Sequence, residues 1–273
     1  MRPYGITLHS MDVLSPRTLD EALRMKAEQP DARPIEGGTD LMVELNFDRA
    51  RPEALLNLNE VAELKGWRRE NGTLRLGAAL TYTEAMVELA AALPALAEAS
   101  RTVGSPQIRN RGTIGGNLGT ASPAGDALPP LLVENAAVEL ASARGTRTMP
   151  LREFLVGPKK NALEDDELIA AVHIDPSGAA QTFMKIGPRN AMVIAVCSLA
   201  LSVDRKRDEL RASFGSAGPV AGLVVAPFAD IDGFPEQVAA AASPIDDVRG
   251  TAAYRRHALR VLTQRALERC LAV

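Results

Sequence analysis

The chain has 273 residues, of which 46% are hydrophobic and 24% are charged, and its formal net charge is −3. A chain of this length and balance is expected to form one large globular domain or two. The acidic net charge and the low aromatic content (4%) argue against nucleic-acid binding, and the lack of long apolar windows argues against a membrane span or a signal peptide, so we expect a cytoplasmic protein.

Three helix starts can be read in the first half of the chain. Thr18 and Glu21 have the spacing of a capping box, and so do Thr81 and Glu84; each pair precedes a segment with helical apolar spacing. Pro94 is in the position of a first-turn proline, which predicts a third helix.

Strand signals lie between these helices without a regular alternation. Asn71 and Gly72 predict a type I′ hairpin over residues 66–77, and residues 131–140 are expected to form a mixed strand. The irregular order argues against a doubly wound parallel sheet and predicts an α+β fold.

From about residue 150 the apolar segments become longer. The strands expected there are 168–174, 183–186 and a hairpin that joins 193–203 to 210–214. Residues 215–243 have weak periodicity and are expected to be a loop. Residues 252–271 predict an amphipathic C-terminal helix, with Leu259, Leu262 and Ala266 on one stripe and arginines opposite.

Two Gly-Gly segments are the strongest functional signals. Gly37-Gly38 precedes Thr39-Asp40, and Gly115-Gly116 precedes Asn117. Glycine permits φ > 0 and lets backbone N–H groups approach an anion, although either segment alone could equally be a turn. Together the two segments favour the pyrophosphate of a dinucleotide. Neither has the Rossmann fingerprint or a Walker A lysine, so a bound nucleotide would require another fold.

Side chains for acid–base or nucleophilic chemistry are few. His9, His173 and His257 are scattered, and we expect each to be structural or solvated. Cys197 and Cys270 are too few for an iron–sulfur cluster or a structural zinc site from this chain alone. We therefore expect neither catalytic side chains nor a metal site here, which suits a protein whose cofactor carries the chemistry.

The glycine segments also carry a family resemblance. Residues 36–41 (EGGTDL) resemble the AGGTDL loop of the FAD-binding medium subunit of molybdenum hydroxylases, the xanthine dehydrogenase and carbon monoxide dehydrogenase flavoprotein family. Residues 113–117 match that family's TIGGN loop. Segments 104–110, 121–126, 185–195 and 215–219 are also similar, so the resemblance covers nearly the whole chain in order.

The resemblance implies a fold and a domain division. Residues 1–175 would form a PCMH-type (vanillyl-alcohol-oxidase-like) FAD-binding domain of two α+β subdomains. Residues 176–273 would form a C-terminal α+β domain with a three-stranded antiparallel sheet and helices.

The resemblance implies FAD as the cofactor. In the family the two glycine loops hold the pyrophosphate through backbone N–H groups. Asp126 matches an aspartate that contacts the adenosine part of FAD, and Ile169 and Lys185 match positions that line the flavin end. The implied cofactor-binding residues are Arg33, Pro34, Ile35, Glu36, Gly37, Gly38, Thr39, Asp40, Thr113, Ile114, Gly115, Gly116, Asn117, Asp126, Ile169 and Lys185.

The implied function is that of an FAD-binding, electron-transferring oxidoreductase subunit of a xanthine dehydrogenase-like complex. Its partners would be a large subunit with molybdopterin and a small subunit with two [2Fe-2S] clusters, and FAD would pass electrons to NAD⁺ or another acceptor. A stand-alone FAD oxidoreductase is the alternative, but little chain remains for a substrate domain. A module that has lost FAD is opposed by the intact glycine pairs and by Asp126. The substrate, the acceptor, the stoichiometry and the role of residues 220–243 are not set by this sequence.

One departure from the family pattern concerns charge. Glu36 replaces the usual alanine and places a carboxylate next to the expected pyrophosphate site. Either its side chain points away, or one of Arg33, Arg109 and Arg111 offsets it.

Overall fold

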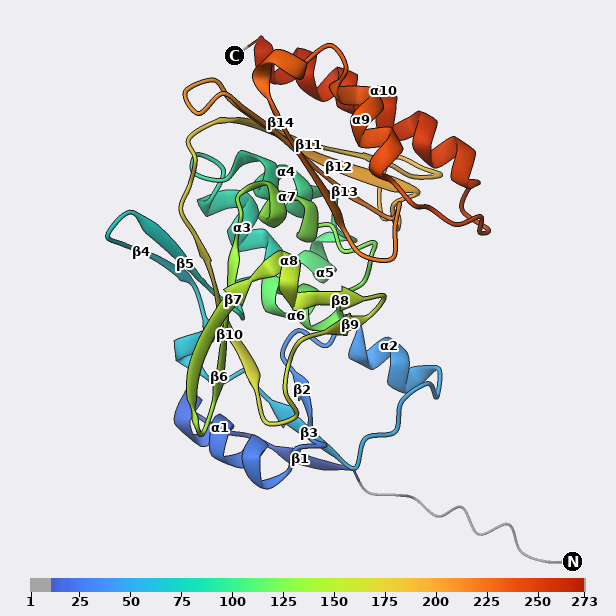
Figure 1. The fold of residues 1–273 in the computed structure, drawn as a ribbon. Coiled ribbons are helices and arrows are strands. Elements are labelled where there is room, and N and C mark those ends of the chain that lie inside the picture. The colour runs from blue at the N-terminus through green and yellow to red at the C-terminus, as the bar shows by residue number, and fades with distance from the viewer. Residues whose placement is uncertain (1–10, 273) are drawn as a thin grey trace, which may run out of the picture.

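The computed structural model describes residues 11–272 (Figure 1). Its helices are α1 (Leu19–Glu28), α2 (Leu41–Asn46), α3 (Tyr82–Glu88), α4 (Pro94–Thr102), α5 (Pro106–Arg109), α6 (Ile114–Thr120), α7 (Leu128–Val133), α8 (Leu151–Phe154), α9 (Phe234–Ala241) and α10 (Ala252–Leu271). Its strands are β1 (Asp12–Leu14), β2 (Arg33–Ile35), β3 (Ala54–Asn57), β4 (Trp67–Glu70), β5 (Thr73–Gly77), β6 (Ala137–Ser142), β7 (Gly145–Pro150), β8 (Leu155–Gly157), β9 (Lys160–Asn161), β10 (Leu168–Ile174), β11 (Ala180–Ile186), β12 (Cys197–Asp204), β13 (Glu209–Gly215) and β14 (Gly222–Pro227).

The N-terminal part of the chain builds two larger sheets around one core, in addition to the two-stranded β8–β9 sheet. Strands β1, β3 and β2 form a parallel sheet, and β4, β5, β10, β6 and β7 form an antiparallel one. Leu56 of the first sheet and Leu76 and Val172 of the second belong to a single buried cluster, which also includes Leu118 of α6. This arrangement confirms the mixed α+β character predicted from the sequence.

Local sequence signals explain where several elements begin. The Thr81 hydroxyl accepts a hydrogen bond from the Glu84 backbone N–H while the Glu84 carboxylate accepts one from the Thr81 N–H, so α3 begins with a complete capping box. Pro94 is the first residue of α4. Asn71 (φ 51°) and Gly72 (φ 95°) both adopt the left-handed region, as a type I′ turn between β4 and β5 requires.

The expected strand over 131–140 is wrong in its first half. Helix α7 occupies Leu128–Val133, with prolines in its first turn, and β6 begins only at Ala137. Every residue of α7 is buried, so its sequence shows no polar face from which helical spacing could be recognised.

The C-terminal sheet has four strands rather than the three expected. β11, β12, β13 and β14 are antiparallel neighbours in chain order. The fourth strand and α9 both lie within 215–243, which the sequence predicted as a loop. β14 is an edge strand between Gly222 and Pro227 with no clear alternation of burial, so its pattern is weak.

The four-stranded C-terminal sheet is covered by helices on both faces, as Figure 1 shows. Helices α9 and α10 cover one face, where Leu259 and Leu262 pack against Leu199. Helices α4 and α7 cover the other, where Ala95 and Ala99 pack against Phe183 and Ala200. The sheet is therefore docked directly on helices of the N-terminal part.

Candidate cofactor site

The first glycine loop leads from β2 into α2. Its two positions require glycine for different physical reasons. A Cβ atom at Gly37 would lie 1.8 Å from the carbonyl oxygen of Arg111, so only glycine permits this close approach. Gly38 has φ +69°, the left-handed region that favours glycine. The loop is thus pressed against the backbone that leads into the second loop.

The backbone N–H groups of this loop are available as donors. In the described residues 11–272, none of the N–H groups from Gly37 to Asp40 donates a hydrogen bond to another protein group. Asp40 occupies the N-cap position of α2, but its side chain makes no capping bond. Successive unpaired N–H groups in a glycine turn form a concave site for an anion such as a phosphate.

The second glycine loop is the first turn of helix α6, and its N–H groups already have acceptors. The Ile114 N–H donates to the Leu80 carbonyl oxygen (2.9 Å) and the Gly115 N–H to that of Ala78 (2.8 Å). The Gly116 N–H donates to the Thr113 hydroxyl (3.0 Å), which caps the helix. The backbone N–H groups that remain free to bind a phosphate are therefore concentrated in the first loop.

The glycines of α6 instead shape a surface. A Cβ at Gly115 would lie 2.6 Å from the Cβ and the carbonyl oxygen of Ala78, so this glycine lets α6 pack closely against the segment that contains Ala78. Gly116 is exposed, and its Cβ would meet only the Thr113 hydroxyl oxygen, at 3.0 Å. The helix therefore presents a bare backbone face at Gly116.

Two contacts join the loops to each other. The Thr120 hydroxyl at the end of α6 donates to the Asp40 carboxylate (2.9 Å). The Arg111 guanidinium donates to the Glu36 carbonyl oxygen (3.0 Å) and to the Asn59 side-chain oxygen (2.6 Å). The loops consequently lie side by side as one unit.

Of the three arginines considered for Glu36, Arg111 is the one that acts on it. Arg33 instead pairs with Glu44, and Arg109 donates to backbone carbonyls of 103 and 104. Burial raises the pKa of the Glu36 carboxyl, and the positive charge of Arg111 opposes this shift. One carboxylate oxygen of Glu36 is buried without a partner.

A turn at 122–126 adds two more polar groups with unused capacity. The side-chain oxygen of Asn117 is buried without a hydrogen bond, and so is one carboxylate oxygen of Asp126. A Cβ at Gly125 would lie 2.8 Å from that Asn117 oxygen, so the glycine lets the turn lie against the Asn117 amide. Buried polar atoms without protein partners are typical of groups that bind a ligand or water.

Asp126 and Lys185 form a buried ion pair between the two parts of the chain. The Lys185 ammonium lies 2.6 Å from the Asp126 carboxylate and also donates to the Thr102 carbonyl oxygen (3.1 Å). Burial raises the pKa of the Asp126 carboxyl, against the opposing effect of Lys185. The resemblance implied opposite ends of the cofactor for these two residues, whereas the structure brings them into direct contact.

Comparisons with known proteins identify the family of the chain. Residues 9–177 match the family described as the FAD binding domain in molybdopterin dehydrogenase. The chain belongs to this family. The FAD-binding subunit is thus an oxidoreductase subunit with FAD as its cofactor, as the resemblance implied.

Its relatives include a putative xanthine dehydrogenase FAD-binding subunit of Escherichia coli (strain K12), 30% identical over 93% of this chain and 94% of the relative. The carbon monoxide dehydrogenase medium chain of Afipia carboxidovorans is also 30% identical, over 96% of this chain and 97% of the relative. A solved carbon monoxide dehydrogenase from Hydrogenophaga pseudoflava has a TM-score of 0.88 at 25% identity and covers 96% of this chain and 97% of that one.

The residues of the FAD-binding subunit fit a dinucleotide. The unpaired N–H groups of the first loop suit a pyrophosphate, and the orphaned oxygens of Asn117 and Asp126 suit hydroxyl or amide donors. Ile169 lies at an irregularity of β10 and contacts α6, since a Cβ at Gly119 would lie 3.7 Å from its Cδ1. It provides an apolar wall next to the bare face of the helix.

Of the two histidines that the structure describes, one is paired within a sheet and the other is exposed. His173 bonds to Glu139, which also pairs with Arg75 across the five-stranded sheet. His257 is exposed on α10, and His9 lies outside the described residues. Within residues 11–272, no cluster of three His, Cys, Asp or Glu side chains could hold a metal ion, and no helix is long and apolar enough to cross a membrane.

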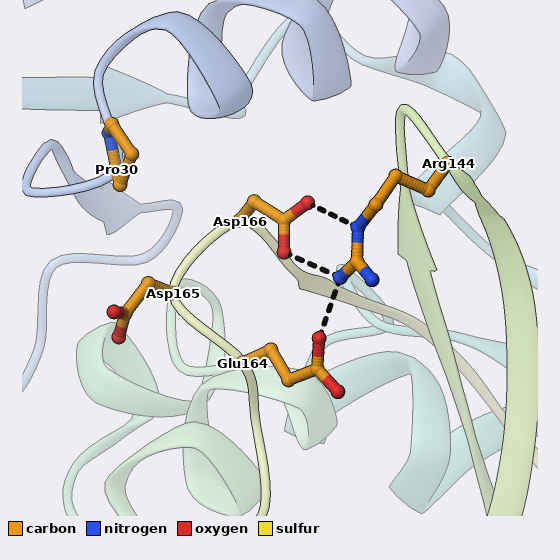
Figure 2. Close-up of a pocket in the computed structure, with 5 residues that line it drawn as sticks. All are labelled: Pro30, Arg144, Glu164, Asp165 and Asp166. Atoms are coloured by element: carbon orange, nitrogen blue, oxygen red, sulfur yellow. Dashed lines mark hydrogen bonds and ion pairs between the residues drawn. The ribbon is translucent and has the colours of Figure 1, made fainter.

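An open hollow of the surface lies away from the glycine loops. Figure 2 shows Arg144 held between the carboxylates of Asp166 (2.7 Å) and Glu164 (2.6 Å), with Asp165 and Pro30 on the opposite side. The Arg144 side chain is 61% exposed, so these ion pairs are screened by solvent. Arg144, Glu164 and Asp166 pair with one another, and none of the five lining residues has a buried side-chain polar atom without a partner.

Proposed function

We propose that this chain is the electron-transferring FAD subunit of a heteromeric molybdenum hydroxylase of the xanthine dehydrogenase kind. A partner with [2Fe-2S] clusters would deliver electrons to the flavin, and NAD⁺ or another acceptor would remove them. A large partner with molybdopterin would hold the substrate. Support comes from relatives of nearly equal length that are named as FAD-binding subunits or medium chains of xanthine and carbon monoxide dehydrogenases.

We infer that the fold is of the PCMH type, with a division into residues 1–175 and 176–273. The boundary falls between β10 and β11, close to the end of the family match at residue 177. Most of the buried cluster around α6 comes from the first part, and the cluster beneath α10 comes wholly from the second.

The observation that carries the proposal is the division of roles between the two glycine loops. The first loop supplies unpaired N–H donors, and the second supplies a bare helix face beside it. We propose that the stretch from Arg33 to Asp40 holds the pyrophosphate, with residues 113–117 beneath it. Asp126, Ile169 and Lys185 would line the remainder of the bound cofactor.

The protein residues would orient and enclose the cofactor rather than react. FAD, when bound, supplies the ability to accept electrons singly or in pairs. Glu36 would stand beside the pyrophosphate, with the positive charge of Arg111 offsetting the charge of its carboxylate. A stand-alone FAD oxidoreductase is the alternative function, but little of the chain remains for a dedicated substrate domain.

The cofactor assignment is tested by adding FAD to the purified chain and measuring the retained flavin absorbance. Wild type is expected to bind FAD without a covalent link. Gly116→Val places a side chain on the bare face of α6, where its Cβ meets only the Thr113 hydroxyl oxygen at 3.0 Å, so flavin retention should be lost while the circular dichroism spectrum is kept. Gly233→Val is the matched control. Gly233 lies outside the site, and a Cβ atom there would lie 3.8 Å from its nearest neighbour, the Asp230 carbonyl oxygen. Unchanged retention in Gly116→Val would refute the placement of the cofactor.

The subunit assignment needs a separate experiment. The chain is expected to co-purify with two partners, one with molybdopterin and one with iron–sulfur clusters, and to have no hydroxylase activity alone. A screen of N-heterocycles, aldehydes and carbon monoxide, with NAD⁺ reduction as the readout, would then identify the substrate class. Full hydroxylase activity of the isolated chain would contradict the proposal and favour the stand-alone alternative.

A further inference from the structure

The turn that follows β13 touches the cofactor site from the side of the C-terminal sheet. A Cβ at Gly215 would lie 2.6 Å from the Ser198 hydroxyl oxygen and 3.2 Å from the Pro123 carbonyl oxygen. The next residue, Ser216, has φ +57°, a left-handed conformation that is uncommon for a residue with a side chain. This segment therefore allows a close approach and has a backbone shape that its own sequence does not favour.

One hydrogen bond links this turn to the 122–126 turn. The Ser216 N–H donates to the Pro123 carbonyl oxygen (2.7 Å). The 122–126 turn is closed on itself, since the Gly125 N–H donates to the Ser122 carbonyl oxygen (2.8 Å). A displacement of Pro123 would therefore move the neighbouring Asp126 as well.

Arg255 of α10 donates a hydrogen bond to the turn that contains Ser216. Its guanidinium donates to the Ser216 carbonyl oxygen (2.6 Å) and pairs with the Asp247 carboxylate. The residue is only 3% exposed, although the sequence placed the arginines of this helix on its solvent face. A buried guanidinium is costly unless it is paired, so its position indicates a specific role.

We propose that Arg255 is a positioning residue for the cofactor site. It fixes Ser216, Ser216 fixes the 122–126 turn through Pro123, and that turn places the free carboxylate oxygen of Asp126. This inference rests on the proposed function, because it takes FAD as the ligand of Asp126. Arginine suits the task better than lysine, since its planar fork reaches two acceptors at once.

The test compares FAD affinity in titrations of the apo-protein, carried out well below the unfolding temperature of each variant. Arg255→Met should weaken FAD binding about tenfold, the loss expected when a charged hydrogen bond no longer supports the site. Arg255→Lys should recover part of the affinity. Arg260→Met is the matched control: Arg260 lies on the same helix in an exposed pair with Glu236, and this variant should bind as wild type does.

A second background separates positioning from general destabilisation. In Asp126→Ala the group that Arg255 positions is gone, so adding Arg255→Met should cause no further loss of FAD affinity. Equal losses in both backgrounds, or wild-type affinity in Arg255→Met, would overturn the inference. If Arg255→Met does not fold, Arg255→Lys is compared in the same two backgrounds. A wild-type titration that never saturates would instead refute the proposed function itself.

Discussion

The Asp126–Lys185 pair allows a quantitative test of how the C-terminal sheet is held on the N-terminal part. The two side chains are 10% and 6% exposed and lie 2.6 Å apart. Lys185→Met removes the cation and leaves the Asp126 carboxylate buried, with one oxygen already lacking a partner. Breaking a buried ion pair in this way costs about 3–5 kcal/mol. At about 2–4 °C per kcal/mol for a chain of this size, the melting temperature should fall by roughly 10 °C.

The pair should also behave as a unit. Asp126→Asn combined with Lys185→Met removes both charges, so the double variant should lose less stability than the sum of the two single variants. Burial already raises the pKa of Asp126, and loss of Lys185 should raise it further. A carboxyl whose folded-state pKa lies above its unfolded value destabilises the fold once it is ionised. The destabilisation by Lys185→Met is therefore largest at neutral pH and decreases as the pH falls.

Urea unfolding of the apo-protein, repeated at several pH values, measures these quantities. Lys159→Met is the matched control, because Lys159 is 59% exposed and lies 3.5 Å from Glu44; its loss should cost no more than about 1 kcal/mol. Equal losses of stability in Lys185→Met and Lys159→Met would refute the reasoning. So would additive losses from the two charge removals in the buried pair.

Three further predictions concern other parts of the molecule. Gly37→Ala should force the two glycine loops apart, because its Cβ would lie 1.8 Å from a carbonyl oxygen; both melting temperature and flavin retention should fall. Thr81→Ala should cost about 1 kcal/mol in urea unfolding, since the hydroxyl caps α3. Burial tends to raise the pKa of Glu139, but hydrogen bonds from Arg75 and His173 outweigh it and the net pKa is lowered. The stability that Glu139 contributes is therefore present above its ordinary pKa of 4.5 and is lost on further acidification, so Glu139→Gln should flatten the acid limb of a stability–pH curve.

The elements that the sequence predicted well are those with local causes. The capping box at Thr81, the first-turn proline at Pro94 and the Asn71-Gly72 turn depend on residues close together in the chain, and all three are present. The bounds predicted for α10 agree with the observed Ala252–Leu271, because this helix has one buried and one solvated face and its apolar spacing can be recognised.

The elements that the sequence did not reveal depend on distant partners. Helix α7 is buried by α4, which comes earlier in the chain, and by β12 and β13, which come later; β14 is defined by its pairing with β13. Arg255 belongs to the same class, because its contact with the Ser216 carbonyl oxygen joins residues that are 39 positions apart. An arginine on the apolar stripe of α10, one turn before Leu259, was the available signal.

The two Gly-Gly pairs show that the same residue type can be required for different physical reasons. Gly37 and Gly115 are fixed by contacts within the protein, with backbone atoms at 1.8 Å and 2.6 Å from their missing Cβ atoms. Gly38 is fixed by its positive φ, whereas Gly116 has neither constraint. If FAD lies against α6, Gly116 is required by the ligand alone. Substitutions at Gly37 and Gly115 should then damage folding and binding together, and only Gly116 should separate the two.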